Sequence, residues 1–291
     1  MLGVVNLDKP TGPTSHDMVG LLRRLTGMRR IGHAGTLDPL ASGVLPILVG
    51  SATRFSEELS GGAKRYTAII RLGQRSVTDD AEGPITTGAG PLPDDGQVAT
   101  ALGTFVGPLE QVPPAFSARK RDGMTAYRAA RAGKPLELAP RLVQVDRIDL
   151  LAMDPGDGWL DVEIDLRCGT GTYVRAIARD LGERLGCGGH LHALRRTEAA
   201  GLRVETALTP PQLEELAGEG RLAEAIMPIE ALLPLPRLAL DPDAVRRFLH
   251  GATQPLPSEL EGRHAIYDGS ELLGVGTLQE GILRPEKVLS R

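Results

Sequence analysis

Residues 160–185 read LDVEIDLRCGTGTYVRAIARDLGERL, a strand, a tight turn and a helix in direct succession. Apolar and charged side chains alternate from Leu160 to Cys168, which predicts a strand with one buried and one solvated face. After the Gly169–Gly171 turn, an apolar stripe with helical spacing follows and stops before Gly186. A central parallel strand would be apolar on both faces. We therefore predict an α+β fold with a mixed, mostly antiparallel sheet flanked by helices and loops.

Further elements are predicted by the same patterns on both sides of this stretch. The expected strands are residues 2–7, 66–72, 143–151, 264–267 and 272–278, and the expected helices are residues 15–26, with Ser15 as N-cap and Gly27 as stop, 97–105 and 123–132. Residues 28–46 lack a sustained period and are rich in Gly and Pro, so we expect a long functional loop there. A Leu-Pro-Leu-Pro stretch at 233–236 is typical of a linker. It predicts two domains, residues 1–233 and a small β-rich domain of residues 234–291.

The composition is that of an ordinary soluble globular protein. Of the 291 residues, 41% are hydrophobic and 24% are charged, which suffices for a sizeable core. No apolar run approaches the length of a signal sequence or a membrane span, so we expect a soluble, cytoplasmic chain without a membrane partner. The two cysteines, Cys168 and Cys187, are expected to be free thiols in a reducing compartment.

The charge distribution is more informative than the net charge of −4, which by itself argues mildly against a nucleic-acid partner. Residues 76–118 contain no Lys or Arg, and residues 205–230 contain a single Arg. The cations are concentrated elsewhere, at Arg23, Arg24, Arg29, Arg30, Lys64, Arg65, Arg119, Lys120, Arg121, Arg128, Arg131, Lys134, Arg195 and Arg196. This clustering is compatible with a basic face, although charge clusters are often only solvated surface.

Residues 32–43, GHAGTLDPLASG, place a single carboxylate, Asp38, in a loop stiffened by Gly and Pro. Gly allows the backbone to approach a ligand closely, and Pro39 restrains Asp38 to an extended conformation. Taken alone, the pattern also fits an Asx-turn in which the aspartate only caps a bend.

Together with other motifs, this segment closely resembles the TruB family, the bacterial tRNA pseudouridine-55 synthases. The matching stretches, in chain order, are LDKPTGPTSHD, GHAGTLDPLASGVLPILVG, ATRF, KRYTAIIRLG, TDDAEG, VPPAFSARK, AYRAARAG, CGTGTYVRAIARDLGERLG and HLHALRRT. They span roughly residues 2–200. Residues 237–291 resemble the family's small C-terminal RNA-binding (PUA-like) domain only in position, size and strand content. The resemblance therefore implies a pseudouridine synthase catalytic domain followed by a small RNA-binding domain.

The resemblance implies catalytic roles for three residues. Asp38 matches the family's catalytic aspartate, Tyr66 the tyrosine that stacks on the target base, and Arg175 the arginine paired with the catalytic carboxylate. Tyr173 matches a neighbouring substrate contact. Because a carboxylate and an arginine favour a bidentate pair, we expect Arg175 to hold Asp38 in its charged form.

Three further residues are assigned to substrate binding by the same resemblance. His33 matches the histidine that fills the place left by flipped bases, Leu194 an apolar residue lining the uracil pocket, and Lys9 a structural lysine near the site. Phe116 stands where a tyrosine is common and Val77 where a polar residue is usual. We expect neither to touch the site.

The reaction that the resemblance implies breaks the N1–C1′ bond of uridine 55 in the T loop of tRNA and forms a C5–C1′ bond. No electrons or groups are exchanged with another molecule, so we expect no cofactor and no metal. Extruding the base costs roughly a few kcal/mol, of which stacking on Tyr66 returns about 1–3 kcal/mol. The carboxylate could add to the uracil ring, attack C1′ or remove a sugar proton, and the sequence favours none of these routes. The expected partner is tRNA, without a guide RNA, bound by a monomer.

Three alternatives remain open from the residues. The Gly169-Thr170-Gly171 turn resembles the start of a dinucleotide-binding fingerprint, but Val174 stands where Gly or Ala is required. Cys187, His190 and His192 offer three ligands for zinc in a short loop, whereas a structural site needs four. The basic clusters also suit an RNA-binding or RNA-folding protein whose catalysis is secondary or lost. Its RNA binding would survive Asp38→Asn, and assistance of tRNA folding could also accompany catalysis.

Overall fold

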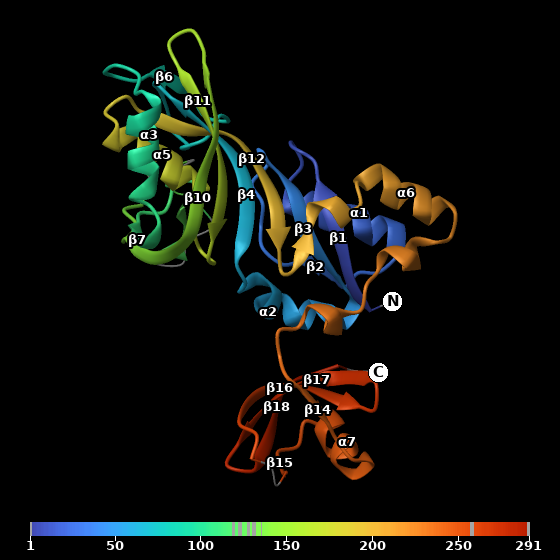
Figure 1. Ribbon diagram of the computed structural model, residues 1–291. Helices are drawn as coiled ribbons and strands as arrows, with labels where there is room; N and C mark the ends of the chain where they lie inside the picture. Colours follow the sequence, from blue (N-terminus) through green and yellow to red (C-terminus); the bar gives the residue numbers. More distant parts are fainter. Residues whose placement is uncertain are drawn as a thin grey trace.

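The computed structural model describes residues 2–117, 120–121, 124–126, 129, 132–134, 136–256 and 259–289. Its largest element is a nine-stranded sheet with the main order β1-β3-β12-β4-β11-β10-β7 and with β2 and β13 at the side (Figure 1). These strands are β1 (Gly3–Lys9), β2 (Ile31–His33), β3 (Ala41–Val49), β4 (Lys64–Leu72), β7 (Gly107–Gln111), β10 (Arg141–Pro155), β11 (Leu160–Cys168), β12 (Gly189–Ala199) and β13 (Leu202–Arg203). Among these described strands, β3 and β12 alone pair in parallel, so the predicted mixed, mostly antiparallel sheet is confirmed.

Strand β11 forms as its alternation predicts. Its apolar face, which includes Val162, is buried in the core. On its polar face, Asp161 pairs with Arg71 and Asp165 with Arg65, both from β4. Each fully buried aliphatic side chain contributes about 1.5–3 kcal/mol to stability, so this face anchors the strand in the core. Because β11 pairs antiparallel with both neighbours, the dinucleotide-binding alternative, which needs parallel strands, is wrong.

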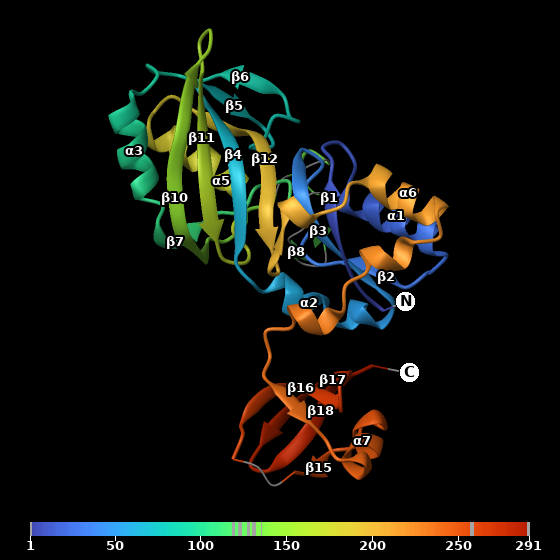
Figure 2. The same cartoon turned by 45° about the vertical axis from the view of Figure 1, so that its right-hand side comes forward.

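Helices pack along two parts of the large sheet (Figure 2). The helix α1 (Ser15–Thr26) packs against β2 and α6 (Pro210–Gly218), and α6 also contacts β1. The helices α3 (Asp95–Gly103) and α5 (Val174–Arg184) pack together, with α3 on β10 and α5 on β12 and β4. Within the described residues, no helix is both long and apolar enough to span a bilayer.

Short elements complete this part of the chain. They are the helix α2 (Ser56–Ser60), the 3-10 helices η1 (Gly50–Phe55), η2 (Val204–Thr206), η3 (Leu222–Ala225) and η4 (Ile229–Leu232), and the hairpins of β5 (Gln74–Ser76) with β6 (Ile85–Thr87) and of β8 (Lys120–Arg121) with β9 (Met124–Thr125). The helix α2 lies at the end of the large sheet that faces the C-terminal part of the chain (Figure 1).

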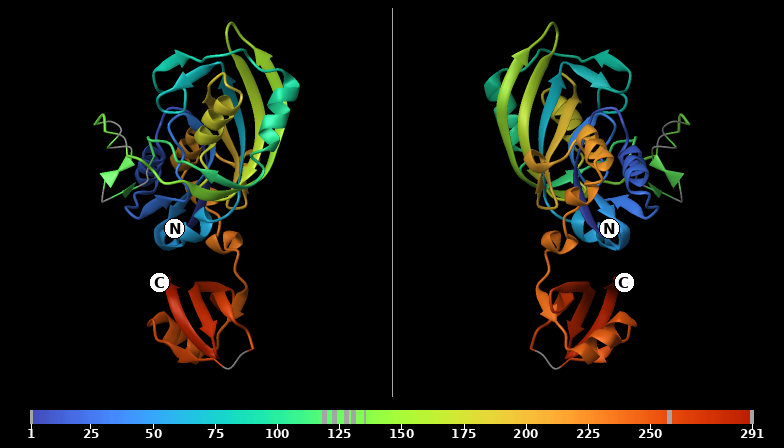
Figure 3. Two further views of the ribbon diagram at one scale, coloured as in Figure 1. Left: turned by 90° about the vertical axis from the view of Figure 1, so that its left-hand side faces the viewer. Right: turned by 90° about the vertical axis from the view of Figure 1, so that its right-hand side faces the viewer.

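The last part of the chain forms a separate five-stranded sheet with the order β14-β16-β17-β18-β15 (Figure 3). Its elements are β14 (Arg237–Ala239), α7 (Pro242–Leu249), β15 (Gln254–Pro255), β16 (Gly262–Asp268), β17 (Glu271–Gln279) and β18 (Ile282–Val288). The helix α7 packs on this sheet through Phe248, which is fully buried. The two strands predicted at 264–267 and 272–278 are confirmed as parts of β16 and β17.

Two local predictions are wrong in detail. The N-cap of α1 is Thr14, not Ser15, and Thr14 shares a capping box with Asp17. The segment 28–46 is not one long loop, because β2 and the first part of β3 lie within it and only residues 28–30 and 34–40 remain as loop. Gly43 lies within β3 because the strand passes close to β12 there: an added Cβ would lie 2.1 Å from the Arg196 carbonyl oxygen.

Strand β12 was not predicted, although it lies at the centre of the large sheet between β3 and β4. Half of the predicted helix at 123–132 lies outside the described residues, as do Arg119, Arg128 and Arg131 of the expected basic face. Its predicted start is wrong, because Met124–Thr125 form β9. Both cysteines are free and buried, as expected.

Candidate active site

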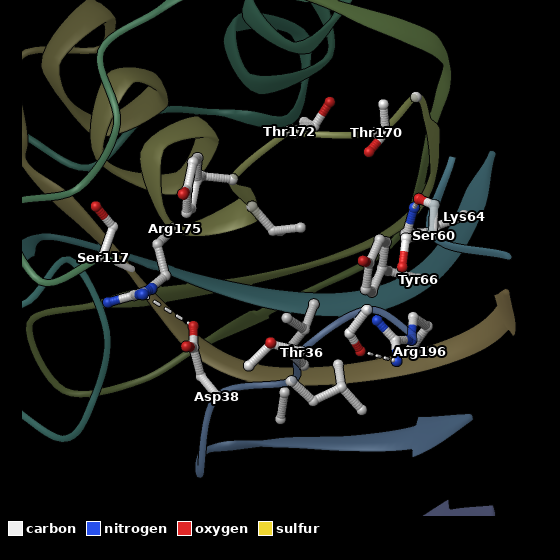
Figure 4. Close-up of a pocket in the computed structure, with 18 of the residues that line it drawn as sticks. Thr36, Asp38, Ser60, Lys64, Tyr66, Ser117, Thr170, Thr172, Arg175 and Arg196 are labelled. Carbon is white, nitrogen blue, oxygen red and sulfur yellow. Dashed lines mark hydrogen bonds and ion pairs between the residues drawn. The ribbon is translucent and has the colours of Figure 1, made fainter. Parts of the chain in front are cut away.

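A cavity of about 600 Å³ opens beside the large sheet, between the loop that follows β2 and the first turn of α5 (Figure 4). Five of the predicted site residues line it: Asp38, Tyr66, Tyr173, Arg175 and Leu194. The other lining residues are Gly35, Thr36, Leu37, Ala41, Ser60, Lys64, Phe116, Ser117, Gly169, Thr170, Gly171, Thr172, Val174 and Arg196. The cavity thus collects side chains from segments that are far apart in the sequence.

Arg175 joins two carboxylates at one end of the cavity. Its Nη2 lies 2.9 Å from Asp38 Oδ2, and its Nη1 lies 3.2 Å from Asp80 Oδ2. It also donates to the carbonyls of Thr78 and Phe116. The Arg175 side chain is only 7% exposed, whereas that of Asp38 is 44% exposed. The expected bidentate pair with Asp38 is therefore wrong in geometry, because the guanidinium divides its donors between two acids.

Backbone and buried side chains hold the loop that carries Asp38. The Ala41 amide donates to the Asp38 carbonyl, and the Ser15 hydroxyl both accepts from the Leu37 amide and donates to the Leu37 carbonyl. Lys9 is fully buried, and its Nζ donates to the carbonyls of Pro10, Pro13 and, at 3.4 Å, Pro39. Burial lowers the pKa of Lys9. Lys9 thus lies below the Asp38 loop and does not line the cavity.

The wall of the cavity is formed by an aromatic ring and an aliphatic side chain on adjacent strands. Tyr66 of β4 is 7% exposed, and Arg196 of β12 stands opposite it in the strand register. Burial raises the pKa of the Tyr66 hydroxyl, while the nearby Arg196 guanidinium acts against this through its charge and a hydrogen bond. Leu194 lies two residues before Arg196 on the same strand. The Tyr173 backbone is held by Gln111, which accepts from its amide and donates to its carbonyl.

Like Lys9, the predicted substrate-binding residue His33 does not line the cavity. It ends β2, opposite Ile47 of β3. Its Nδ1 is buried and has no hydrogen-bond partner among the described residues. Burial, and then the charge of Arg196, lower the pKa of His33, so the imidazole is neutral at pH 7.

Several residues of the site were missed or misplaced by sequence reasoning. Asp80 is 3% exposed and belongs to the TDDAEG motif, but nothing in that motif indicates a contact with Arg175. Phe116 was expected away from the site, yet it lines the cavity and its carbonyl accepts from Arg175. Val77 is 62% exposed and does not line this cavity, as expected. Glu82 lies near Asp80 and Asp38, and its pKa is raised by burial and by these two negative charges.

The candidate zinc ligands do not form a loop site. His190 and His192 lie on β12 with their ring centroids 6.4 Å apart, and His192 Nε2 lies 3.3 Å from a guanidinium nitrogen of Arg71. In the part of the chain that the structure describes, no group of three or more His, Cys, Asp or Glu residues is arranged to hold a metal ion.

Comparison with known proteins agrees with this site. The model for the N-terminal domain of TruB family pseudouridylate synthases matches residues 23–174, and the model for the tRNA pseudouridylate synthase B C-terminal domain matches residues 175–234. The chain is 43% identical to tRNA pseudouridine synthase B of Ralstonia nicotianae, covering 99% of this chain and 94% of the relative. It is also 43% identical to the protein of the same name from Burkholderia lata, covering 99% of this chain and 90% of the relative.

Solved structures show the same fold. An H/ACA RNP bound to a substrate RNA containing 2′-deoxyuridine matches with a TM-score of 0.74 and 27% identity, covering 99% of this chain and 85% of the other. A Cbf5–Nop10–Gar1 complex matches with a TM-score of 0.73 and 28% identity, covering 98% and 84%. Sequence, fold and cavity thus agree, and the chain belongs to the TruB family of pseudouridylate synthases, which isomerise uridine to pseudouridine in tRNA.

Proposed function

We propose that this chain isomerises uridine 55 in the T loop of tRNA and that Asp38 is the essential carboxylate. The observation that carries the proposal is the pairing of Asp38 with the buried Arg175 at the edge of a cavity whose wall is the ring of Tyr66. The relatives named tRNA pseudouridine synthase B support tRNA as the substrate. We propose that the chain acts on tRNA without a guide RNA, as a monomer in the cytoplasm.

The cavity suits a single extruded nucleotide. Its volume of about 600 Å³ lies within the range of small-molecule pockets, whereas a base inside a stacked loop could not reach Asp38. We propose that the uracil stacks on Tyr66 and contacts Leu194 and Tyr173. His33, which lies outside the cavity, would fill the space that the flipped bases leave in the RNA loop, and Lys9 would support the Asp38 loop from below.

In this arrangement Arg175 positions one carboxylate oxygen of Asp38 while the side chain stays open to the cavity. The reaction breaks N1–C1′, turns the base and forms C5–C1′, while C5 loses its proton and N1 gains one. Asp38 can contribute by addition to the ring, by attack at C1′ or by removal of a sugar proton, and the same residues serve each route. Fixing the carboxylate relative to the base is the contribution that all three routes share.

We further propose a domain boundary between residues 233 and 234. Residues 1–233 would form the catalytic domain, and residues 234–291 would form a small RNA-binding domain that contacts tRNA beyond the T arm. The separate five-stranded sheet of residues 237–288 supports this division.

The decisive experiment measures tritium release from an unmodified tRNA transcript labelled at uracil C5. The wild type should release tritium without any added cofactor, because the C5 hydrogen must leave when C5–C1′ forms. Asp38→Asn should release none while it still binds the transcript. Asp157→Asn, which makes the same change at an exposed position between β10 and β11, should match the wild type. Binding without release by the wild type would refute the enzymatic assignment.

A further inference from the structure

Two cations stand at the end of the cavity away from the Asp38–Arg175 pair. Figure 4 shows Lys64 and Arg196 on one side of the cavity and Asp38 with Arg175 on the other. Neither Lys64 nor Arg196 forms a salt bridge with a carboxylate among the described residues, unlike the neighbouring Arg65, which pairs with Asp165. Two unneutralised charges in one cavity favour an anionic ligand.

Arg196 is built into the wall rather than left on the surface. Its side chain is among the largest that are fully buried, with 1% of the residue exposed. Its Nε donates to the Val44 carbonyl at 2.7 Å and its Nη2 to the Gly35 carbonyl at 2.9 Å. These carbonyls orient the guanidinium, but they carry no net charge that would neutralise it. Burying a guanidinium without a carboxylate is costly, so its position calls for an explanation.

Lys64 shares this environment. Its Nζ donates to the carbonyls of Ser60 and Gly62, both at 2.9 Å, and an ammonium has one further N–H to offer. Burial lowers the pKa of Lys64, and the positive charge of Arg196 lowers it further. An anion between the two side chains would relieve both effects.

The space between the two cations lies over Gly35. A Cβ added to Gly35 would lie 3.4 Å from Arg196 Nη1 and 3.8 Å from Lys64 Cε. Gly35 has a φ of +86°, a conformation that glycine adopts without strain. It is half-buried, as is Lys64, so the space over it is open to solvent and to a ligand. Glycine at this position keeps the space between the cations free.

We propose that Lys64, Arg196 and Gly35 form a subsite for one phosphodiester group of the RNA next to the extruded uridine. The proposal rests on the proposed function, because RNA is the anion that would enter this cavity. Tyr66 lies between this subsite and Asp38 in the close-up (Figure 4), so a base stacked on Tyr66 would bring its own backbone within reach. Phosphate contacts of this kind set the register of a nucleic acid without reading its sequence. The subsite would hold the distorted backbone while Asp38 acts on the nucleotide.

The test measures binding of T-arm RNA in the catalytically inactive Asp38→Asn background, with and without Lys64→Gln. Losing one charge-assisted hydrogen bond should weaken binding about tenfold. The slope of log Kd against log salt concentration should fall by about 0.7, the value for one phosphate contact on a single strand. Lys64→Arg should restore the slope. Arg65→Gln removes the same charge from the adjacent residue on the other face of β4 and should leave binding at the level of the parent.

Neutral methylphosphonate linkages then locate the contact. One such linkage at a time is placed near the target uridine, and the nucleotide before it is a 2′-deoxynucleotide. The control RNA has the same 2′-deoxynucleotide followed by an ordinary phosphate. One linkage should weaken binding to the parent but not to Lys64→Gln, because the partner charge is already gone. Losses that simply add at every position would overturn the proposal. A second result would also overturn it: in protein that retains Asp38, Lys64→Gln slows the single-turnover reaction although no linkage shows this coupling. The cation would then act on the base and not on a phosphate. Tritium release by the wild type tests the proposed function separately.

Discussion

Arg175 is the residue on which the geometry of the candidate site depends. It is a buried cation with an exposed carboxylate on one side and a buried one, Asp80, on the other. Because a guanidinium has fixed donor directions, the bond to Asp80 orients the donors that face Asp38. Asp80 therefore acts on Asp38 through Arg175, and we call it a positioning residue.

We expect Asp80→Asn to fold but to lose activity. The change removes the buried partner of Arg175 and should lower the free energy of unfolding by about 3 kcal/mol, as for other broken buried ion pairs. Misplacement of Asp38 should lower the single-turnover rate of tritium release by about 10–100-fold, with a smaller effect on tRNA binding.

Asp79→Asn is the matched control. Asp79 pairs with Arg179 outside the cavity and has a φ of +62°, which asparagine tolerates well. Its single-turnover rate should equal that of the wild type. A wild-type rate for Asp80→Asn would show that Arg175 needs no second acid.

At the scale of elements, the strand β12 organises the site, since it supplies Leu194 and Arg196 and joins β3 to β4. It begins with Gly189, which packs directly under α5. The close approach leaves no space for a side chain on the facing residue of the helix, Gly182. Helix and strand are therefore held at a distance that only two glycines allow.

We expect alanine at two helical glycines to have opposite effects. A Cβ at Gly182 would lie 2.0 Å from the Gly189 backbone nitrogen, so Gly182→Ala must push α5 away from β12 and should cost about 1–3 kcal/mol or more. At Gly20 in α1 no atom lies within 4 Å of an added Cβ, and Gly20→Ala should stabilise the protein by about 0.5–1 kcal/mol. Urea denaturation of the two variants checks both signs, and destabilisation by Gly20→Ala would contradict the argument.

The histidines of β12 should make stability depend on pH. Burial lowers the pKa of His190 below its usual 6.5, and the same cause lowers that of His192. Below pH 6.5 the unfolded chain gains protons that the folded chain does not bind. The contribution to stability is therefore complete above pH 6.5 and is lost as the pH falls toward the lowered pKa.

Replacing His190 should reduce this pH dependence. Between pH 6.5 and 5.5, His190→Gln should make the loss of unfolding free energy smaller by up to about 1.4 kcal/mol per pH unit. The exposed His250 serves as control, because His250→Gln should leave the curve of the wild type unchanged. Denaturant titrations at several pH values measure this, and parallel curves for wild type and His190→Gln would refute it.

At the scale of the whole molecule, the C-terminal sheet is attached to the rest of the chain by more than its linker. Glu58 of α2 has a side chain only 4% exposed, and it accepts from Arg263 at 2.7 Å and from Lys287 at 2.8 Å. Burial would raise the pKa of Glu58, but the hydrogen bonds from Lys287 and Arg263 outweigh it and lower the pKa. Phe55 and Val275 belong to one cluster of buried apolar side chains that includes both parts.

We expect Glu58→Gln to loosen this attachment. Arg263 and Lys287 would lose the charge of their shared, buried partner, so calorimetry should show the C-terminal part unfolding at a lower temperature than the large sheet. If the C-terminal sheet contacts tRNA beyond the T arm, KM should rise for full-length tRNA and stay constant for a T-arm fragment.

The neighbouring acid provides the control for this change. Glu57 is 89% exposed and lies 3.5 Å from Lys287, and an exposed pair of this kind contributes little. Glu57→Gln should keep a single transition and the KM of the wild type. The interpretation fails if Glu58→Gln also behaves in this way.

The sequence by itself determined the features that depend on neighbouring residues. The alternation of β11, the left-handed Gly27 after α1 and the Pro39-stiffened loop of Asp38 all follow from patterns within a few residues. Of the seven residues that the family resemblance assigned to the site, five line the cavity: Asp38, Tyr66, Tyr173, Arg175 and Leu194. What these patterns encode is the preference of a short segment for one conformation and one buried face.

Only the tertiary structure decided which segments meet. β12 was not predicted because its N-terminal glycine is typical of a loop and its arginines are typical of a surface. Both fit a strand here because Gly189 packs against α5 and Arg196 lines the cavity. Asp80 and Arg175 are 95 residues apart, and their contact depends on how two distant segments pack. The same holds for Lys64 and Arg196, which join only because β4 and β12 pair in one register. Local sequence sets the conformation of each segment, whereas the burial of shared apolar faces sets which segments lie together. The packing of distant segments therefore determines where the charged side chains of the site meet.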